Sequence, residues 1–353
     1  MSITKTLFVR ALSLVGVLFA VLVMVVVTFG ATGFSDRMLT AIVSEEVRGI
    51  RQGLSETIRD PDQIEKTISA HRLELEESYG LNQPWYFRLP SMITRVAKLD
   101  LGEARTLKTA EGSSKVGSLI LERLPRSVML VTTSTIITAL FGLILGVTLA
   151  TRVGSKSDRI ASILAAASNA VPAWWAGILM IMLTYLILST FGVRLFPPGG
   201  MYSSPPPDEM FPRILDLTWH AILPITTMVL ISIGSWTYVV RTMVMNTAQE
   251  DFVTVARAKG LREQNVMFNH ILRVSAPPIL TGLILGLASS LAGAILTETV
   301  FSWPGMGLLY YEAILSADES VVVALTFMFT LIYIVARFAL EVLYVIVDPR
   351  VRY

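Results

Sequence analysis

The sequence contains no cysteine and only three histidines in 353 residues. Without cysteine, the chain offers no disulfide framework, no thiolate metal site and no thiol redox chemistry. The histidines are His71, His220 and His270, and their wide separation lacks the spacing of metal ligands. Neither an HExxH nor a GxSxG motif occurs, so the sequence disfavours a membrane enzyme.

The dipeptide Gly-Lys is also missing. A phosphate-binding P-loop ends in Gly-Lys-Ser or Gly-Lys-Thr, because the lysine must reach the β- and γ-phosphates from the turn. The chain therefore has no such loop, and we expect it to bind no cofactor itself. If ATP drives its activity, another chain must bind the nucleotide.

Charged residues make up only 16% of the chain, whereas an ordinary soluble domain has about a quarter. Hydrophobic residues make up 53%, and the mean hydropathy is +0.62, which together indicate a membrane protein. A helix needs about 20 apolar residues to cross a bilayer. Six runs are long enough: residues 11–35, 127–151, 160–193, 217–240, 274–297 and 320–347.

These runs predict six transmembrane helices, because open strands cannot satisfy their backbone groups in lipid. Pro172 is expected to break the third run near its start. The first run follows Lys5 and Arg10, as the apolar part of a signal peptide would. It is longer than the roughly 7–15 residues typical of a signal peptide and has no clear cleavage site, so we expect a retained anchor.

Positive charge in the short loops predicts the orientation. With the N-terminus inside, the inner segments carry Lys5, Arg10, Arg152, Lys156, Arg159, Arg241, Arg257, Lys259, Arg262, Arg273, Arg350 and Arg352. The outer loop 299–319 carries no lysine or arginine. Both termini are therefore expected to be cytoplasmic.

The chain is expected to have three parts: an N-terminal transmembrane helix (1–35), an extracytoplasmic region (36–126) and a five-helix core (127–353). Apolar residues recur at helical spacing in residues 38–54 and 62–81, and Asp60-Pro61 separates the two stretches. The extracytoplasmic region is therefore predicted to be a small helical subdomain.

A polar segment, residues 251–278, separates the fourth and fifth apolar runs. Its pattern predicts a short helix over 251–259 with Phe252, Val255, Ala256 and Lys259 on one face. Gly260 is placed as a left-handed C-cap, and a second helical stretch over 261–273 should end before Pro277 and Pro278 open the next span. Periodicity alone also permits a solvated amphipathic loop on lipid headgroups.

The stretch "DFVTVARAKGL" (251–261) resembles the EAA loop of ABC transporter permeases, in the form found in the dipeptide/oligopeptide family. The acidic first residue of the generic pattern is replaced by Thr254, as expected in the peptide branch. Other stretches along the chain also resemble motifs of this family. From the N-terminal side they are "YGLNQPWY", "DLG", "ERLPRS", "VPAWW", "ETVFSWPGMG" and "DPRVR". Together they cover roughly residue 62 to the C-terminus. Residues 36–59 depart from the family as an added helix.

This resemblance implies an all-α permease subunit, of the first-permease type, in an ATP-driven importer in the plasma (inner) membrane of a prokaryote. Its implied partners are a second permease, two cytoplasmic ATPase domains that bind ATP and Mg²⁺, and an extracytoplasmic solute-binding protein, with no nucleic acid. Peptides are the implied cargo, while oligosaccharides or nickel complexes remain alternatives. The loop at 246–275 would contact the ATPase through Asp251, Phe252, Val255, Ala256, Arg257, Ala258, Lys259, Gly260 and Leu261.

The "FSWPGMG" segment is predicted to form a hairpin at the outer mouth, with Trp303 in the interfacial belt. The gate candidates there are Glu298, Phe301, Trp303, Pro304 and Gly305. Packing between permeases is an equal alternative for this segment. Arg337 and Glu341 are spaced i,i+4 in the last run. Because they lie away from the middle of the membrane, a structural pair or a contact with the partner permease is favoured over an ion site. With so few charges in the spans, a secondary transporter is the weaker reading.

Overall fold

The computed structural model describes residues 3–57, 60–87, 90, 94, 100–187, 190–193, 195–290, 294–316 and 318–347. Across these residues the chain is almost entirely helical, and its β pairing is limited to an isolated bridge between Glu103 and Lys115. The all-α prediction is confirmed. The chain divides into two compact units, and each is described separately.

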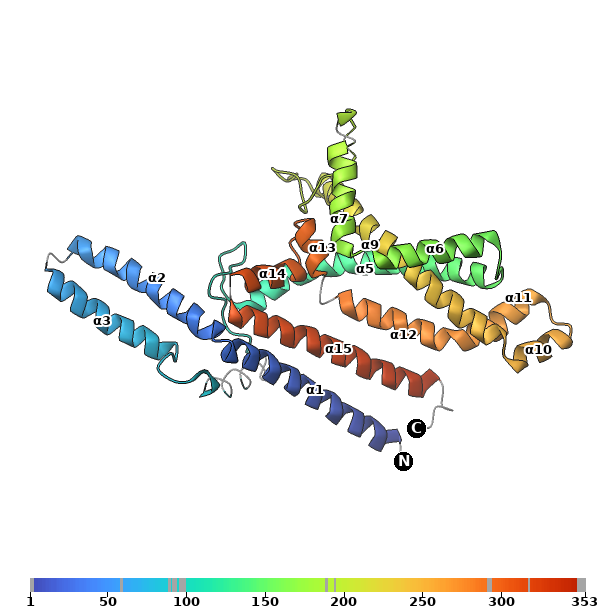
Figure 1. Cartoon of the computed structure of the whole chain (residues 1–353), viewed down its shortest axis with the longest axis horizontal. Helices are drawn as coiled ribbons and strands as arrows, with labels where there is room; N and C mark the ends of the chain where they lie inside the picture. The colour runs from blue at the N-terminus through green and yellow to red at the C-terminus, as the bar shows by residue number, and fades with distance from the viewer. Residues whose placement is uncertain are drawn as a thin grey trace. The chain divides into compact units, whose positions relative to one another are not determined.

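Five helices are long and apolar enough to cross a membrane. They are α1 (Ile3–Ala31), α5 (Val116–Ala150), α9 (Met210–Ala248), α12 (Leu272–Ser290) with the turns preceding it, and α15 (Glu319–Val347). All five coincide with predicted runs. Figure 1 shows them as long rods.

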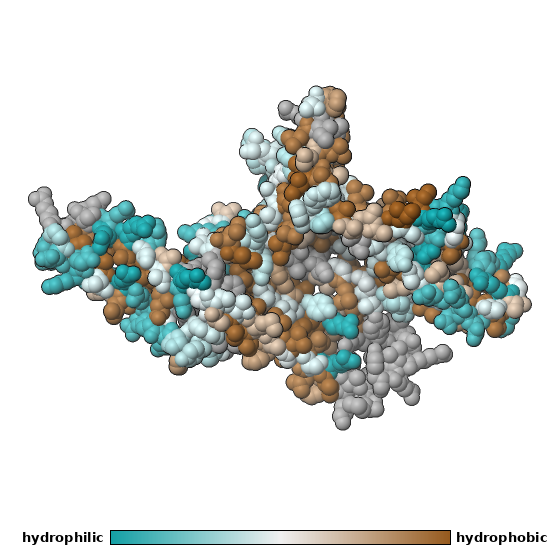
Figure 2. Space-filling model, in the orientation of Figure 1, coloured by the Kyte–Doolittle hydropathy of each residue, from teal (hydrophilic) through white to brown (hydrophobic). Residues whose placement is uncertain are grey.

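The third predicted run is a bent pair of helices, α6 (Lys156–Ala170) and α7 (Ala173–Ile181), which meet at 96°. The break lies at Val171-Pro172, because proline disfavours helical geometry in the residue before it. A π-helical turn, η2 (Met182–Ile187), follows α7. The chain thus has up to six spans, if the bent pair counts as one. Figure 2 shows hydrophobic residues along α7.

The fifth span begins earlier than predicted. Instead of opening a helix, Pro277 and Pro278 lie inside α12, which continues from α11 (Glu263–Asn265) and a π-helical turn, η3 (Val266–Ile271). Proline is tolerated within membrane helices where local π adjustments and Ser or Thr side chains re-satisfy the freed carbonyl groups.

One unit comprises residues 11–119 and 313–331. In it, α2 (Phe34–Thr57) and α3 (Pro61–Ser78) lie side by side, and the predicted helix over 36–59 and the break after it are confirmed (Figure 1). The Asp60 side chain caps α3 by accepting from the Asp62 backbone N–H, with Pro61 at the first helical position. A short 3₁₀ turn, η1 (Trp85–Phe87), packs on Gly30, where a Cβ would overlap the Trp85 ring.

The second unit contains residues 120–312 together with both chain ends. It holds most of α5, the α6–α7 pair, α9, a short helix α10 (Asp251–Ala258), α12 and α13 (Ile295–Val300). A further short helix, α14 (Met306–Leu315), begins here and was not predicted. The candidate functional residues all belong to this unit.

Candidate coupling site

Helix α10 and the turn after it form an elbow between α9 and α12. Helix α10 ends at the C-cap Lys259, and Gly260 has φ +73°, so its predicted left-handed conformation is confirmed. The Gly260 N–H donates to the Arg257 carbonyl at 2.9 Å, and the Leu261 N–H donates to the Ala256 carbonyl at 3.4 Å. These two bonds form a Schellman motif, which ends a helix sharply.

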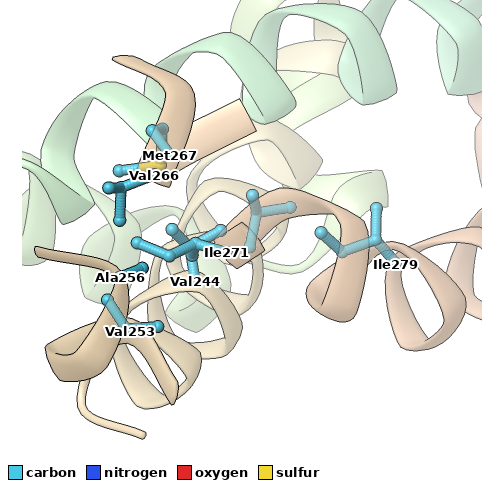
Figure 3. Packing of buried hydrophobic residues seen from close by; sticks show 8 residues of the cluster. Val244, Val253, Ala256, Val266, Met267, Ile271 and Ile279 are labelled. Atoms are coloured by element: carbon cyan, nitrogen blue, oxygen red, sulfur yellow. The ribbon is translucent and has the colours of Figure 1, made fainter. Parts of the chain in front are cut away.

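The buried face of α10 is anchored to both neighbouring helices. Val253 is fully buried and Ala256 is nearly so, in a cluster with Val240, Val244, Val266, Met267, Ile271 and Ile279. Figure 3 shows Val253 and Ala256 of α10 pointing toward Val244 of α9 and Ile271 of η3. Because these side chains are buried against one another, a force on α10 is transmitted to α9 and α12.

The outer face of α10 presents apolar side chains to the surroundings. Phe252 is 40% exposed and Val255 is 51% exposed, although both are large hydrophobic residues. Lys259 and Leu261 are also exposed beside them. Hydrophilic residues gather around α10 and α11 in Figure 2, so this apolar pair is framed by polar surface. Such a patch is typical of a protein interaction site.

One member of the predicted outer face lies elsewhere. Ala256 belongs to the buried cluster, together with Val253, which the sequence analysis did not single out. Helical spacing groups Ala256 with Phe252 but cannot say which side of a short helix is covered. Val253 could have indicated the buried side, because residues 253 and 256 are three apart and so share a face of the helix.

An exposed ion pair closes the elbow. Arg257 donates to both carboxylate oxygens of Glu263, at 3.2 and 2.6 Å. Hydrogen bonding to Glu263 raises the pKa of Arg257 above its usual range, so its charge is retained. Asp251 and Ala258 are exposed at the two ends of the same helix. Both side chains of the pair are largely exposed, which limits its contribution to about 0–1 kcal/mol.

A buried ion pair joins α6 to α9. Arg241 binds Asp158 through two hydrogen bonds, one of them from Nη2 to Oδ2 at 2.8 Å. Asp158 also accepts from the Gly154 backbone N–H at 2.9 Å. The side chains of Arg241 and Asp158 are only 12% and 7% exposed, so water screens the pair little. This pair fixes the start of α6 against α9, two turns before α9 reaches the elbow.

Replacing Arg241 by lysine is expected to lower the free energy of unfolding by about 1.5 kcal/mol, because a lysine cannot bind both carboxylate oxygens in the same planar geometry. The matched control is Arg257→Lys in the exposed pair, with an expected loss below about 0.5 kcal/mol. Thermal unfolding of the detergent-solubilised protein measures both. Equal losses would show that burial of the Asp158 pair is unimportant.

A second candidate site surrounds Glu298 on α13. Its side chain is fully buried, and its two oxygens accept four hydrogen bonds. Ser127 Oγ and the Ala294 N–H donate to Oε1 at 2.8 and 3.0 Å, and the Gly307 and Leu308 N–H groups donate to Oε2 at 2.8 and 3.1 Å. The carboxyl therefore caps the N-terminus of α14, where negative charge is stabilised.

The turn between α13 and α14 closes over this carboxyl. Ser127 Oγ accepts from the Met306 N–H at 2.6 Å. At Gly305 a Cβ would lie 2.3 Å from Ser127 Oγ and 2.4 Å from Glu298 Oε2, so only glycine permits this approach. The "ETVFSWPGMG" segment is thus a helix–turn–helix braced on Ser127 within α5, and the predicted simple hairpin is wrong.

Trp303 is not exposed, as a tryptophan that faces an interfacial belt would be. Its side chain is fully buried against Leu130 and Ala221, and its Nε1–H donates to the Arg126 carbonyl at 3.1 Å. The Arg126 side chain donates in turn to the Pro304 carbonyl at 3.4 Å. Phe301 is buried as well, and its carbonyl accepts from the Gly200 N–H at 2.8 Å. The gate candidates therefore pack within this unit.

Other singled-out residues lie apart from these sites. Arg337 is partly buried on α15, whereas the Glu341 side chain lies outside the described part of the structure, as do Arg350 and Arg352. His220 Nδ1 contacts the Asp216 carbonyl at 2.8 Å one turn away on α9. Among the described residues, no three His, Asp or Glu side chains are grouped to hold a metal ion.

Five helices of membrane length, with up to six spans if the bent pair counts as one, define a multi-span membrane protein. Residues 142–353 match the family described as "Binding-protein-dependent transport system inner membrane component". The chain belongs to this family of ABC transporter permeases. It is a multi-pass inner membrane protein and a subunit of a larger transport complex.

Curated relatives agree over most of the chain. The oligopeptide transport system permease protein AppB of Bacillus subtilis is 31% identical over 82% of this chain and 87% of its own length. The di/tripeptide transport system permease protein DppB of Pseudomonas aeruginosa is 30% identical over 92% and 95%. The inner membrane ABC transporter permease protein YejB of Escherichia coli is 30% identical over 79% and 75%.

Proposed function

We propose that this chain is a permease subunit of an ATP-driven importer, and that α10 is the surface on which a cytoplasmic ATPase docks. The observation that carries this proposal is the two-sided elbow. Val253 and Ala256 fix α10 to α9 and η3, while Phe252 and Val255 leave an apolar face open. A docked ATPase that moves would therefore move the membrane helices with it.

The apolar pair supplies the docking energy. Full burial of a Val or Phe side chain contributes roughly 1.5–3 kcal/mol, and these two side chains are already partly covered in the single chain. The exposed Lys259 and the Arg257–Glu263 pair lie at the rim, where charges steer association and fix register more than they add affinity. ATP and Mg²⁺ would bind only to the partner ATPases.

The cargo we assign is a peptide, delivered by an extracytoplasmic binding protein to a path formed with a second permease. The support is the cargo in the names of the relatives, which are oligopeptide and di/tripeptide permeases at about 30% identity. In this proposal both termini are cytoplasmic, residues 36–126 form an extracytoplasmic region, and residues 127–353 form the permease core. The Glu298 brace, which is Glu298 with its hydrogen-bond donors Ser127, Ala294, Gly307 and Leu308, then lies at the outer mouth and moves as one rigid piece.

A pull-down tests the docking surface. The intact complex is purified in mild detergent, and co-purified chains are quantified by mass spectrometry. The double variant Phe252→Ala, Val255→Ala is expected to reduce recovery of an ATPase chain by about 100-fold, since it removes about 3 kcal/mol of buried apolar contact. The control is Phe191→Ala, which truncates an aromatic residue that is 77% exposed away from the elbow.

Recovery of the ATPase with the double variant at the level of the control would contradict the docking assignment. A wild-type chain that purifies without any ATPase, and still transports in liposomes, would contradict the importer assignment as a whole.

A further inference from the structure

An apolar groove of about 460 Å³ runs between α5, η3 and α12 in the second unit. Residues between 143 and 148 of α5, Phe268 of η3 and residues between 272 and 283 of α12 line it. Thr148 carries the only polar side-chain group of this lining, and its hydroxyl donates to the Ile144 carbonyl at 2.7 Å. Ile144 and Phe268 are both more than 60% exposed. The groove therefore suits an apolar occupant that forms no hydrogen bonds.

The groove lies in the half of the predicted spans that is nearer the elbow. On α12 it extends from Leu272 to Leu283, which is about 16 Å at a rise of about 1.5 Å per residue. The predicted span starts at residue 274, so the groove reaches about 14 Å into it. On α5 the groove lies within about 12 Å of residue 151, where the predicted span ends. Half of a hydrocarbon core is about 15 Å thick, so the groove has the length of one leaflet.

Two arginines lie at the end of the groove that faces the elbow. Arg152 follows Thr148 by four residues, and Arg273 precedes Leu280 by seven, so each continues a row of lining residues along its helix. The Arg152 N–H donates to the Leu149 carbonyl at 3.0 Å, which carries the helical path of α5 on through this residue. The apolar groove thus has a basic end.

The charge of these arginines is not balanced by the chain. Both residues are exposed, and neither side chain forms an ion pair within the part of the chain that the structure describes. The sequence has no acidic residue between positions 123 and 157 or between positions 264 and 297. An occupant that complements the whole groove therefore has a hydrocarbon part about one leaflet long and an anionic group at its end.

We propose that this groove binds an anionic phospholipid of the cytoplasmic leaflet, with an acyl chain between α5 and α12 and the headgroup phosphate at Arg152 and Arg273. Basic pockets between membrane helices on the cytoplasmic side attract such headgroups. Arginine suits this role because its guanidinium binds two phosphate oxygens at once. The inference rests on the proposed function, which places the elbow in the cytoplasm.

Charge favours a lipid over a second permease as the occupant. Cytoplasmic ends of membrane spans are enriched in lysine and arginine, so a neighbouring permease would bring further positive charge to Arg152 and Arg273. A free phosphate ion would pair with the arginines, but it would leave the apolar lining uncovered. A phospholipid satisfies both parts of the groove.

The position of the groove links this lipid to the elbow. Ile279 lines the groove and also belongs to the buried cluster that holds Val253 and Ala256 of α10 (Figure 3). An acyl chain in the groove therefore packs on a side chain that anchors the elbow. Bound anionic lipid is expected to stabilise this anchor.

The test uses the complete transporter in phosphatidylcholine liposomes that contain a trace of phosphatidylglycerol with a photoactivatable diazirine in one acyl chain. After illumination, labelled peptides are mapped by mass spectrometry, and wild-type label is expected at residues 143–148 and 272–283. The double variant Arg152→Gln, Arg273→Gln should lower this labelling about 25-fold, since each basic residue near the membrane surface contributes about fivefold in affinity. Both substitutions are at exposed positions.

The matched control is Lys156→Gln, Arg159→Gln. It removes the same charge from exposed positions on α6, which contributes no residue to the groove, and should change groove labelling less than about twofold. Ala276→Phe fills the groove and should lower groove labelling by diazirine-bearing phosphatidylglycerol and phosphatidylcholine alike. Label on Ile178 of α7, which is 40% exposed, provides the reference for bulk lipid.

The outcomes separate this inference from the proposed function, because recovery of an ATPase chain is measured on the same preparations. Groove labelling that prefers phosphatidylglycerol and falls only in the arginine and Ala276 variants supports the lipid site. Equal labelling by both lipids in the wild type, or equal loss in the arginine variant and its control, overturns the lipid site even where the ATPase is recovered. Absence of groove label together with ATPase recovery also overturns it, and assigns the groove to the second permease. Preferential label without any ATPase supports the lipid site and contradicts the importer assignment.

Discussion

Replacing Gly260 by valine is expected to reduce the peptide imported per ATP hydrolysed by about tenfold. Gly260 has φ +73°, a conformation that costs an L-residue roughly 1–2 kcal/mol and a β-branched residue more. A Cβ there would meet no atom within 4 Å, so the strain comes from the backbone alone. The strain is relieved if the end of α10 unwinds, and the Schellman bonds from Gly260 and Leu261 are then lost.

The matched control is Gly260→Asn. Asparagine also adds a side chain, and it tolerates the left-handed conformation far better than valine does. We therefore expect Gly260→Asn to retain most of the coupling in reconstituted transport and ATPase assays. Wild-type coupling in both variants would show that the conformation of Gly260 is irrelevant. The same loss of coupling in both variants would assign the defect to the added side chain at the turn.

Removal of the Glu298 side chain is expected to have the largest effect on stability. Glu298→Ala leaves the Ser127 hydroxyl and three backbone N–H groups without their acceptor. Each buried unsatisfied group costs about 1–3 kcal/mol, so a loss of at least about 3 kcal/mol is expected. The variant should unfold at a markedly lower temperature or fail to accumulate in the membrane.

Glu298→Gln separates charge from shape. The glutamine keeps one acceptor oxygen but turns an NH₂ donor toward N–H groups, so an intermediate loss is expected. Glu209→Gln, at an exposed position before α9, is the control and should leave thermal unfolding unchanged. Wild-type stability in both Glu298 variants would mean that the brace between α5, α13 and α14 contributes nothing.

The sequence predicted the centres of the spans well because hydropathy is a property of neighbouring residues. It missed their ends where charge interrupts the apolar run. Helix α5 begins at Val116, well before the predicted residue 127, and this extra stretch carries charged residues, including Glu122 and Arg126, which pair at 3.1 Å. The bend at Pro172 and the conformation of Gly260 were predictable, since each follows from the geometry of one residue.

The Glu298 brace was not predictable in this way. Its donors come from Ser127, Ala294, Gly307 and Leu308, which the chain brings together only on folding. Trp303 shows the same limit. A tryptophan followed by proline and glycine has the same local sequence whether its side chain is buried or lies at the membrane interface. Within α10, helical spacing found the exposed Phe252 and Val255 and could not assign Ala256 to the buried side.

The claim that α10 is the docking surface can be tested by cross-linking, because the chain has no cysteine of its own. Val255→Cys places a thiol on the exposed face and Val253→Cys places one on the buried face of the same helix. A short thiol-reactive cross-linker applied to the assembled transporter should join position 255, and not position 253, to an ATP-hydrolysing chain. Cross-linking at neither position, or equally at both, would contradict the coupling role of α10.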